Sequence, residues 1–297
     1  MLGVVNLDKP VGPTSHDMVG MMRRLTGTRR IGHAGTLDPL ASGVLPILVG
    51  AATRFSAELT GGSKRYDAVI RLGARSVTDD AQGPIEPAAG PLPDESAVRA
   101  ALATFVGTFD QLPPAFSARK LGGRTAHRAA RAGDPIALPP RSVTIHALDM
   151  LAYEREDDRV HVRVDLRCGA GTYVRSLARD LGEVLGCGGY LRALRRTEAA
   201  GLGVDGSFTP ERLEALAADG RLGDAILPVG DLLPLPRVIL DRDAAHAFRN
   251  GSARSLGDRP SADGRAAVFE GGELIGIGSV TANLLQPEKV LPREAAG

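Results

Sequence analysis

Residues 160–168, VHVRVDLRC, alternate strictly between apolar and polar side chains. Because successive side chains of a strand point to opposite faces, this pattern predicts a strand that is buried on one side and faces solvent on the other. The glycines Gly169 and Gly171 separate this strand from an expected helix. The residues expected on the buried face of that helix are Val174, Leu177, Leu181 and Val184.

Further segments show either the two-residue period of a strand or the 3.6-residue period of a helix. Apolar strands are expected at residues 3–7 and 68–72, and a helix is expected at about residues 94–106. Thr14 followed by Asp17 has the spacing of a capping pair and predicts a helix start. The expected fold is therefore α+β (mixed α/β), with a largely antiparallel sheet and helices and loops around a cleft.

A change in pattern predicts a boundary near residue 234. Beyond it the sequence has short apolar stretches with glycine turns, and the pair Gly271 and Gly272 suits a β-hairpin. We therefore expect a large domain over residues 1–233 and a small β domain over residues 234–297. The prolines that mark the boundary are Pro228, Pro234 and Pro236.

Composition limits the function classes. The chain has 297 residues, is 43% hydrophobic and carries a formal net charge of +1, so any nucleic-acid footprint must come from local basic clusters. The two cysteines, Cys168 and Cys187, suit a reducing cytoplasm, and the chain lacks both a signal peptide pattern and an apolar run long enough for a membrane. The basic candidates are Arg23, Arg24, Arg29, Arg30, Arg192, Arg195 and Arg196.

Residues 31–50, IGHAGTLDPLASGVLPILVG, combine glycines, a histidine and a lone acid. The Gly-rich first half of this segment has neither the period of a strand nor that of a helix. It therefore predicts an ordered loop with His33 between two glycines. Pro39 disfavours the helical region at Asp38, so the loop presents a single carboxylate. On spacing alone, Asp38 before Pro39 is more typical of a helix start, with Asp38 as the N-cap.

The run from Gly32 to Gly43 resembles the catalytic signature GH(A/T)G(T/A)LDPLA(S/T)G of the bacterial tRNA pseudouridine-55 synthases, the TruB family. The resemblance extends over nearly the whole chain. It implies that Asp38 is the essential catalytic residue and that His33 contacts the substrate RNA. It also implies a C-terminal RNA-binding module of the PUA type, a small β pseudobarrel.

Other segments match further motifs of that family. The resemblance implies that Tyr66 stacks on the target uracil and that Tyr173 lies under it. It also implies that Arg175 pairs with Asp38 and that Leu194 contacts substrate. From pattern alone, Arg175 would be a solvent-facing helix charge and Leu194 a core residue. We expect three further residues to support the site: Lys9, Lys64 and Asp80.

One segment departs from the family's pattern. Residues 113–133, PPAFSARKLGGRTAHRAARAG, resemble the family's PPxxSAxKxxGxxxYxxAR, but His127 stands where the family has a tyrosine. Any family role of that aromatic side chain is therefore open at this position.

The implied reaction breaks the C1′–N1 bond of a uridine, turns the base and joins C1′ to C5. Nothing is oxidised, so we expect no cofactor, and no metal-ligand spacing is present. The target base must be flipped out of folded RNA, and His33 is our candidate to fill the gap. Whether Asp38 attacks carbon or removes a sugar proton stays open.

The resemblance implies a T-arm tRNA substrate, no guide RNA, no membrane and a monomer in the cytoplasm. Two other classes remain: an RNA-binding or tRNA-folding protein without catalysis, and a synthase that acts on another RNA or with a guide RNA. An ordinary glycosidase is disfavoured, because residues 31–50 offer no second carboxylate near Asp38.

Overall fold

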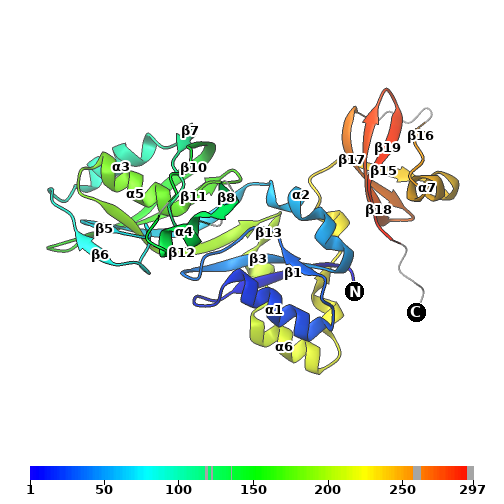
Figure 1. Cartoon of the computed structure of the whole chain (residues 1–297), viewed down its shortest axis with the longest axis horizontal. Helices are drawn as coiled ribbons and strands as arrows, with labels where there is room; N and C mark the ends of the chain where they lie inside the picture. The colour runs from blue at the N-terminus through cyan, green and yellow to red at the C-terminus, as the bar shows by residue number, and fades with distance from the viewer. Residues whose placement is uncertain (118–119, 122, 135, 257–261, 293–297) are drawn as a thin grey trace.

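One large sheet runs through most of the chain (Figure 1). The computed structural model describes residues 1–117, 120–121, 123–134, 136–256 and 262–292. Within these residues the sheet has ten strands: β1 (Gly3–Lys9), β2 (Ile31–His33), β3 (Ala41–Val49), β4 (Lys64–Leu72), β7 (Gly107–Gln111), β10 (Arg141–Arg155), β11 (Val160–Cys168), β12 (Gly189–Ala199), β13 (Leu202–Gly203) and β14 (Ile226–Leu227).

The strand order explains how distant segments meet. The main path runs β14-β1-β3-β12-β4-β11-β10-β7, with β2 paired to β3 and β13 paired to β12. Among the described strands of this sheet, only β3 and β12 pair in parallel, and the other pairs are antiparallel. The predicted mixed fold with a largely antiparallel sheet is confirmed.

The alternating stretch is the strand that its pattern predicts. β11 covers Val160–Cys168 and alternates between buried and partly or fully exposed residues along its length. The helix after it, α5 (Val174–Val184), buries Val174, Leu177 and Leu181 as expected. Val184 was predicted to be buried but is 61% exposed. It is the last residue of α5, and the chain turns back toward β12 without covering it.

Four helices cover one face of the large sheet: α1 (Ser15–Thr26), α3 (Glu95–Ala103), α5 and α6 (Pro210–Ala218). Their apolar side chains join those of the strands in one buried cluster. In Figure 1, α1 and α6 lie beside β1 and β3, whereas α3 and α5 lie beside β10 and β11. The predicted capping pair is confirmed, because Thr14 and Asp17 form a reciprocal capping box at the start of α1.

A separate five-stranded sheet follows the prolines and forms the expected small β domain. The predicted hairpin is confirmed, since Gly271 and Gly272 connect two strands with φ angles of 56° and 89°. The helix of this domain was not predicted. Its elements are β15 (Arg237–Leu240), α7 (Arg242–Arg249), β16 (Arg254–Ser255), β17 (Gly264–Glu270), β18 (Glu273–Thr281) and β19 (Leu284–Val290).

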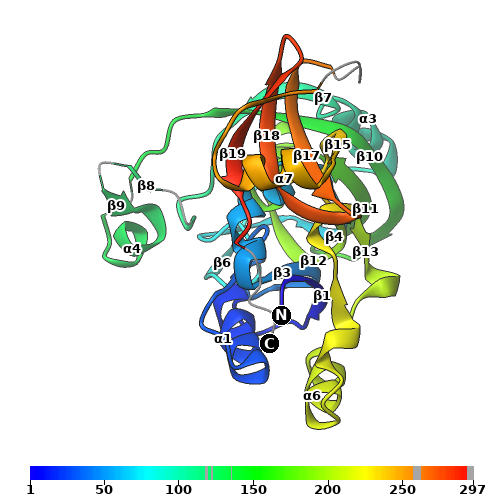
Figure 2. The same cartoon turned by 90° about the vertical axis from the view of Figure 1, so that its right-hand side faces the viewer.

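Within the described residues, two two-stranded sheets lie outside the ten-stranded and five-stranded sheets. β5 (Ala74–Ser76) pairs with the exposed β6 (Ile85–Pro87), and neither strand was among those expected from the sequence. β8 (Lys120–Leu121), β9 (Arg124–Thr125) and α4 (Ala126–Arg131) form an arm that projects from the rest of the molecule in Figure 2. The segment 113–133 includes this arm, and its residues 118, 119 and 122 lie outside the described residues.

The small β domain packs on the face of the sheet opposite α1. Apolar side chains from η1 (Gly50–Phe55) and α2 (Ser56–Thr60) join those of β17 and β18 in a second buried cluster. Glu58 of α2 accepts hydrogen bonds of 2.7 Å from both Arg265 and Lys289. The Glu58 side chain is only 4% exposed, so this acid ties the two sheets together in a desolvated contact.

Replacing Glu58 by Gln should weaken this contact by about 1–2 kcal/mol at pH 7, because Lys289 and Arg265 each lose a charge-assisted hydrogen bond, although Arg265 keeps its ion pair of 2.8 Å with Glu288. Burial alone raises the pKa of Glu58, but the hydrogen bonds from Lys289 and Arg265 outweigh it and leave the pKa below its ordinary value. The contribution is therefore complete above the unfolded pKa, near 4.3, and is lost as pH falls through the folded pKa.

Urea unfolding of both proteins at several pH values measures this difference. Glu95→Gln is the matched control, because Glu95 forms an ion pair of 2.7 Å with Arg99 in which both side chains are more than half exposed. A Glu58→Gln protein with the same unfolding free energy as the parent at pH 7 would contradict the prediction.

Candidate active site

A cavity of about 190 Å³ lies where the 34–40 loop meets β4 and the start of α5. Asp38 lies at this cavity, together with four other residues proposed from the sequence. Those four are Tyr66, Tyr173, Arg175 and Leu194. The remaining lining residues are Thr36, Leu37, Ser117, Thr172 and Val174.

Asp38 is presented by a tight connection between β2 and β3. The Ala34 amide donates to Pro46 O at 2.9 Å and the Ala41 amide donates to Asp38 O at 3.0 Å, so the loop is ordered at both ends. No helix begins at Asp38, because the chain turns directly into β3. The helix-start interpretation is therefore wrong, and the loop interpretation holds. The Asp38 side chain is 40% exposed and reaches the cavity.

Arg175 is the cation beside this acid. Its side chain is only 7% exposed, so the interpretation as a solvent-facing helix charge is wrong. The Nε atom lies 2.9 Å from Asp38 Oδ2 and 3.7 Å from Asp80 Oδ2. The two Nη atoms donate to Thr78 O at 3.1 Å and to Phe116 O at 2.9 Å. The guanidinium is thus fixed in one plane, facing the acid.

Asp80 supplies a second carboxylate that residues 31–50 lack. It is 4% exposed, and its Oδ1 accepts hydrogen bonds from Thr78 Oγ1 at 2.6 Å and from the Gln82 amide at 3.0 Å. The chain turns just before it, where Asp79 has a φ of 60°. Asp80 therefore adds a second negative charge near the Nε atom of Arg175 that contacts Asp38, without lining the cavity.

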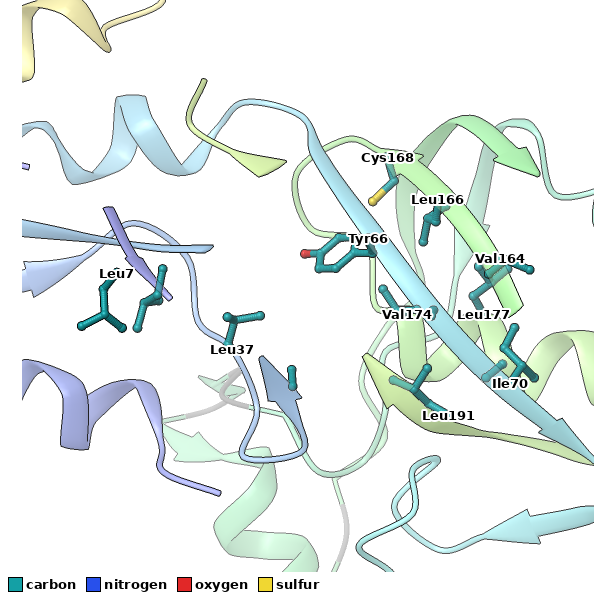
Figure 3. Packing of buried hydrophobic residues seen from close by; sticks show 14 of the residues in the cluster. Leu7, Leu37, Tyr66, Ile70, Val164, Leu166, Cys168, Val174, Leu177 and Leu191 are labelled. Carbon is teal, nitrogen blue, oxygen red and sulfur yellow. The ribbon is translucent and has the colours of Figure 1, made fainter. Parts of the chain in front are cut away.

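The aromatic side chains of the cavity are fixed by the backbone around them. Tyr66 is the third residue of β4 and 8% exposed, and Figure 3 shows its ring extending toward Leu37, away from Val164 and Leu177. Burial raises the pKa of Tyr66, so the phenol stays neutral at physiological pH. Tyr173 is held through its backbone, because its N–H donates to Gln111 Oε1 at 2.9 Å and its carbonyl accepts from Gln111 Nε2 at 3.1 Å.

Two buried residues that hold the Asp38 loop were missed as site residues. The Ser15 hydroxyl accepts from the Leu37 amide at 2.8 Å and donates to the Leu37 carbonyl at 2.9 Å. The Arg196 guanidinium donates to Val44 O at 2.7 Å, to Gly35 O at 3.0 Å and to Thr36 O at 3.4 Å. The sequence carries no signal for the role of Arg196.

Arg196 corrects one sequence expectation. It was grouped with the basic residues that are candidates for an RNA surface, but it is only 1% exposed. Its contacts to backbone carbonyls make it a structural cation beneath the loop. Four other candidates from that group, Arg23, Arg24, Arg29 and Arg30, are exposed.

The remaining predicted residues lie around the cavity without lining it. His33 is the last residue of β2, so the prediction that it sits on the loop is wrong. Burial lowers the pKa of His33, and the nearby Arg196 lowers it further, which keeps the imidazole neutral at pH 7. Lys9 donates to the carbonyls of Pro10 and Pro13, both at 2.8 Å, and burial lowers its pKa to about 8 against the opposing effect of Asp38. Lys64 donates to Gly62 O at 2.7 Å.

His127, which replaces the family's tyrosine, contacts the segment that borders the cavity. Its backbone amide donates to Ser117 O at 3.0 Å, and its ring Nδ1 lies 3.3 Å from the same oxygen. This residue therefore fixes the carbonyl of a lining residue.

Within the described part of the chain, no group of three or more His, Cys, Asp or Glu side chains is arranged to hold a metal ion. No described helix is both long and apolar enough to cross a membrane.

Comparison with known proteins places this geometry in a family. Residues 23–174 match the family model "TruB family pseudouridylate synthase (N terminal domain)", and residues 175–234 match "tRNA pseudouridylate synthase B C-terminal domain". Proteins named "tRNA pseudouridine synthase B" from Ralstonia pickettii (strain 12J) and Burkholderia mallei (strain NCTC 10247) are 40% and 42% identical. Both alignments cover 97% of this chain, with 94% and 96% of the relatives.

Solved structures give the same result for the fold. A chain of an H/ACA RNP bound to a substrate RNA containing 2′-deoxyuridine aligns with a TM-score of 0.73 and 26% identity, over 98% of this chain and 86% of that chain. A chain of a Cbf5-Nop10-Gar1 complex aligns with a TM-score of 0.72 and 27% identity, over 98% and 85%.

Replacing Arg196 by Lys should destabilise the protein by about 2–4 kcal/mol, because one ammonium group cannot span carbonyls on both sides of the loop. A displaced loop should also slow turnover by about 10²-fold. Urea unfolding and a single-turnover assay measure the two effects. Arg195→Lys is the control, since Arg195 is 41% exposed and contacts Asp8 at the surface. Equal behaviour of the two variants would show that Arg196 does not hold the loop.

Proposed function

Because this chain belongs to the TruB family of pseudouridylate synthases, we propose that it isomerises uridine-55 in the T arm of tRNA to pseudouridine. It is a tRNA pseudouridine synthase, an isomerase, as its relatives of 40–42% identity are named. The observation that carries the proposal is the Asp38–Arg175 pair of 2.9 Å at the cavity that Tyr66 lines.

The proposed roles follow from these contacts. Asp38 is the catalytic carboxylate, and Arg175 neutralises and orients it from a buried position. A cavity of about 190 Å³ is smaller than a typical ligand pocket, which suits one base and excludes a stem. The target uridine therefore has to leave the RNA stack before it reaches Asp38, at a cost of a few kcal/mol.

Aromatic side chains offset that cost. Tyr66 stacks on the everted uracil, with Tyr173 on the other side and Leu194 at the edge, and stacking on an aromatic ring contributes about 1–3 kcal/mol per base. His33 fills the gap left in the RNA. The lowered pKa of His33 supports this role, because a neutral imidazole stacks without bringing a charge between bases.

The rest of the RNA needs a larger surface. We assign it to the projecting arm, with Arg124 and Arg128, and to the small β domain beyond residue 234, which packs against α2. This division places the catalytic domain at residues 1–233 and the RNA-binding domain at 234–297. The enzyme acts as a monomer without cofactor in this proposal.

A guided synthase is the second candidate, because the similar solved structures come from an H/ACA RNP and from a Cbf5-Nop10-Gar1 complex. The higher identity to proteins named tRNA pseudouridine synthase B, over 97% of the chain, favours the stand-alone enzyme. Tritium release from a uracil-labelled T-arm hairpin decides between them. The stand-alone enzyme converts the hairpin with no added RNA, whereas a guided enzyme does not.

Asp38→Asn should reduce single-turnover pseudouridine formation by at least about 10³-fold, because the amide can neither carry the charge nor act as nucleophile or base. The affinity for the T-arm hairpin should change little, since phosphate contacts dominate it. Asp67→Asn is the control on the other face of the sheet, where Asp67 pairs with Arg163. An active Asp38→Asn protein, or one that no longer binds the hairpin, removes the catalytic assignment.

Arg175→Lys should lower the turnover number by about 10²-fold or more, because an ammonium group cannot contact Asp38, Thr78 O and Phe116 O together. Arg163→Lys, on the outer surface of β11, is the matched control and should keep its activity. Pre-steady-state rates at saturating hairpin measure the effect. Unchanged rates in the Arg175→Lys protein would contradict the proposed role of the Asp38–Arg175 ion pair.

A further inference from the structure

Ser117 has a buried hydroxyl group without a hydrogen-bond partner among the described residues. The residue is 3% exposed, and its Oγ atom makes no hydrogen bond to the described residues. It lines the same cavity as Asp38 and Arg175. Most buried polar side chains in folded proteins are hydrogen-bonded, so an unpaired hydroxyl at this position requires an explanation.

The rest of Ser117 is firmly held. Its carbonyl accepts from the His127 amide at 3.0 Å, and the preceding carbonyl, of Phe116, accepts from Arg175 Nη2 at 2.9 Å. The backbone at this position is therefore tied to the arm on one side and to the catalytic arginine on the other. The backbone of Ser117 is thus held in place, whereas its hydroxyl has no partner among the described residues.

Other buried polar atoms in the described residues also lack partners, but they lie elsewhere. Among the residues that line the cavity, Ser117 alone carries such an atom. Ser176, one residue beyond Arg175, shows the usual behaviour, because its buried hydroxyl donates to Leu112 O at 2.8 Å. Further atoms of this kind in the described residues belong to Asn6, His33, Glu58, Arg71, Arg141, His161 and Thr197.

We propose that Ser117 is a specificity-determining residue whose hydroxyl forms a hydrogen bond with the polar edge of the everted uracil. A hydroxyl both donates and accepts, so it pairs with either a ring carbonyl or the N3–H group. A site with a buried polar group of this kind discriminates against ligands that leave it unpaired. This inference rests on the proposed function, because it requires a base in the cavity.

The test is Ser117→Ala in the full-length chain, assayed with the unmodified T-arm hairpin. We expect kcat/KM to fall about tenfold, the effect of one hydrogen bond, and hairpin affinity to change less than twofold. The midpoint of thermal unfolding should stay equal or rise, because no protein hydrogen bond is lost and a buried unpaired group is removed.

Ser176→Ala is the stability control and should lower the unfolding midpoint, since its hydroxyl is bonded within the protein. A Ser117→Ala protein with the parent's kcat/KM overturns the inference. So does a drop in activity that comes with a lower midpoint, which indicates a structural or water-mediated role. If Ser117→Ala behaves like the parent while Asp38→Asn is inactive, the inference alone fails. If Asp38→Asn is active, the proposed function fails instead.

Discussion

The guanidinium of Arg175 is the interaction on which the site depends. It joins four segments that are far apart in the chain: the Asp38 loop, the Thr78–Asp80 turn, the base of the arm at Phe116, and α5 itself. A buried cation is costly unless all its donors are satisfied, and here carboxylates and carbonyls satisfy them from different directions. The same contacts that make burial of the charge tolerable also fix the position of the acid.

The buried guanidinium of Arg196 contacts the loop that carries Asp38. Arg196 donates to the backbone carbonyls of Gly35, Thr36 and Val44, so it holds the loop in its shape. Ser15 adds a two-way contact to Leu37, directly before the acid. The loop therefore owes its shape to residues from α1 and β12, which explains how a Gly-rich stretch without a regular period is nevertheless ordered.

Local sequence patterns were sufficient to predict part of the fold. The alternation in β11, the capping box at Thr14 and the glycine pair at 271–272 each depend on neighbours in sequence, so they were predictable. The pairing of Arg175 with Asp38 came only through the family resemblance, because nothing in a single helix reveals that an arginine faces a loop 137 residues away. Arg196 and the orphan hydroxyl of Ser117 were not predictable, since burial of a polar group depends on tertiary packing.

The parallel pairing of β3 with β12 has a consequence for how the protein is made. β12 lies between β3 and β4, and its backbone approaches β3 so closely that a side chain at Gly43 would collide with Arg196 O. A nascent chain on the ribosome carries Asp38, on the loop before β3, and Tyr66, on β4, early, but β3 and β4 have no common neighbour until residues 189–199 emerge. The acid and the tyrosine are thus brought into one cavity only when synthesis of this middle strand is complete.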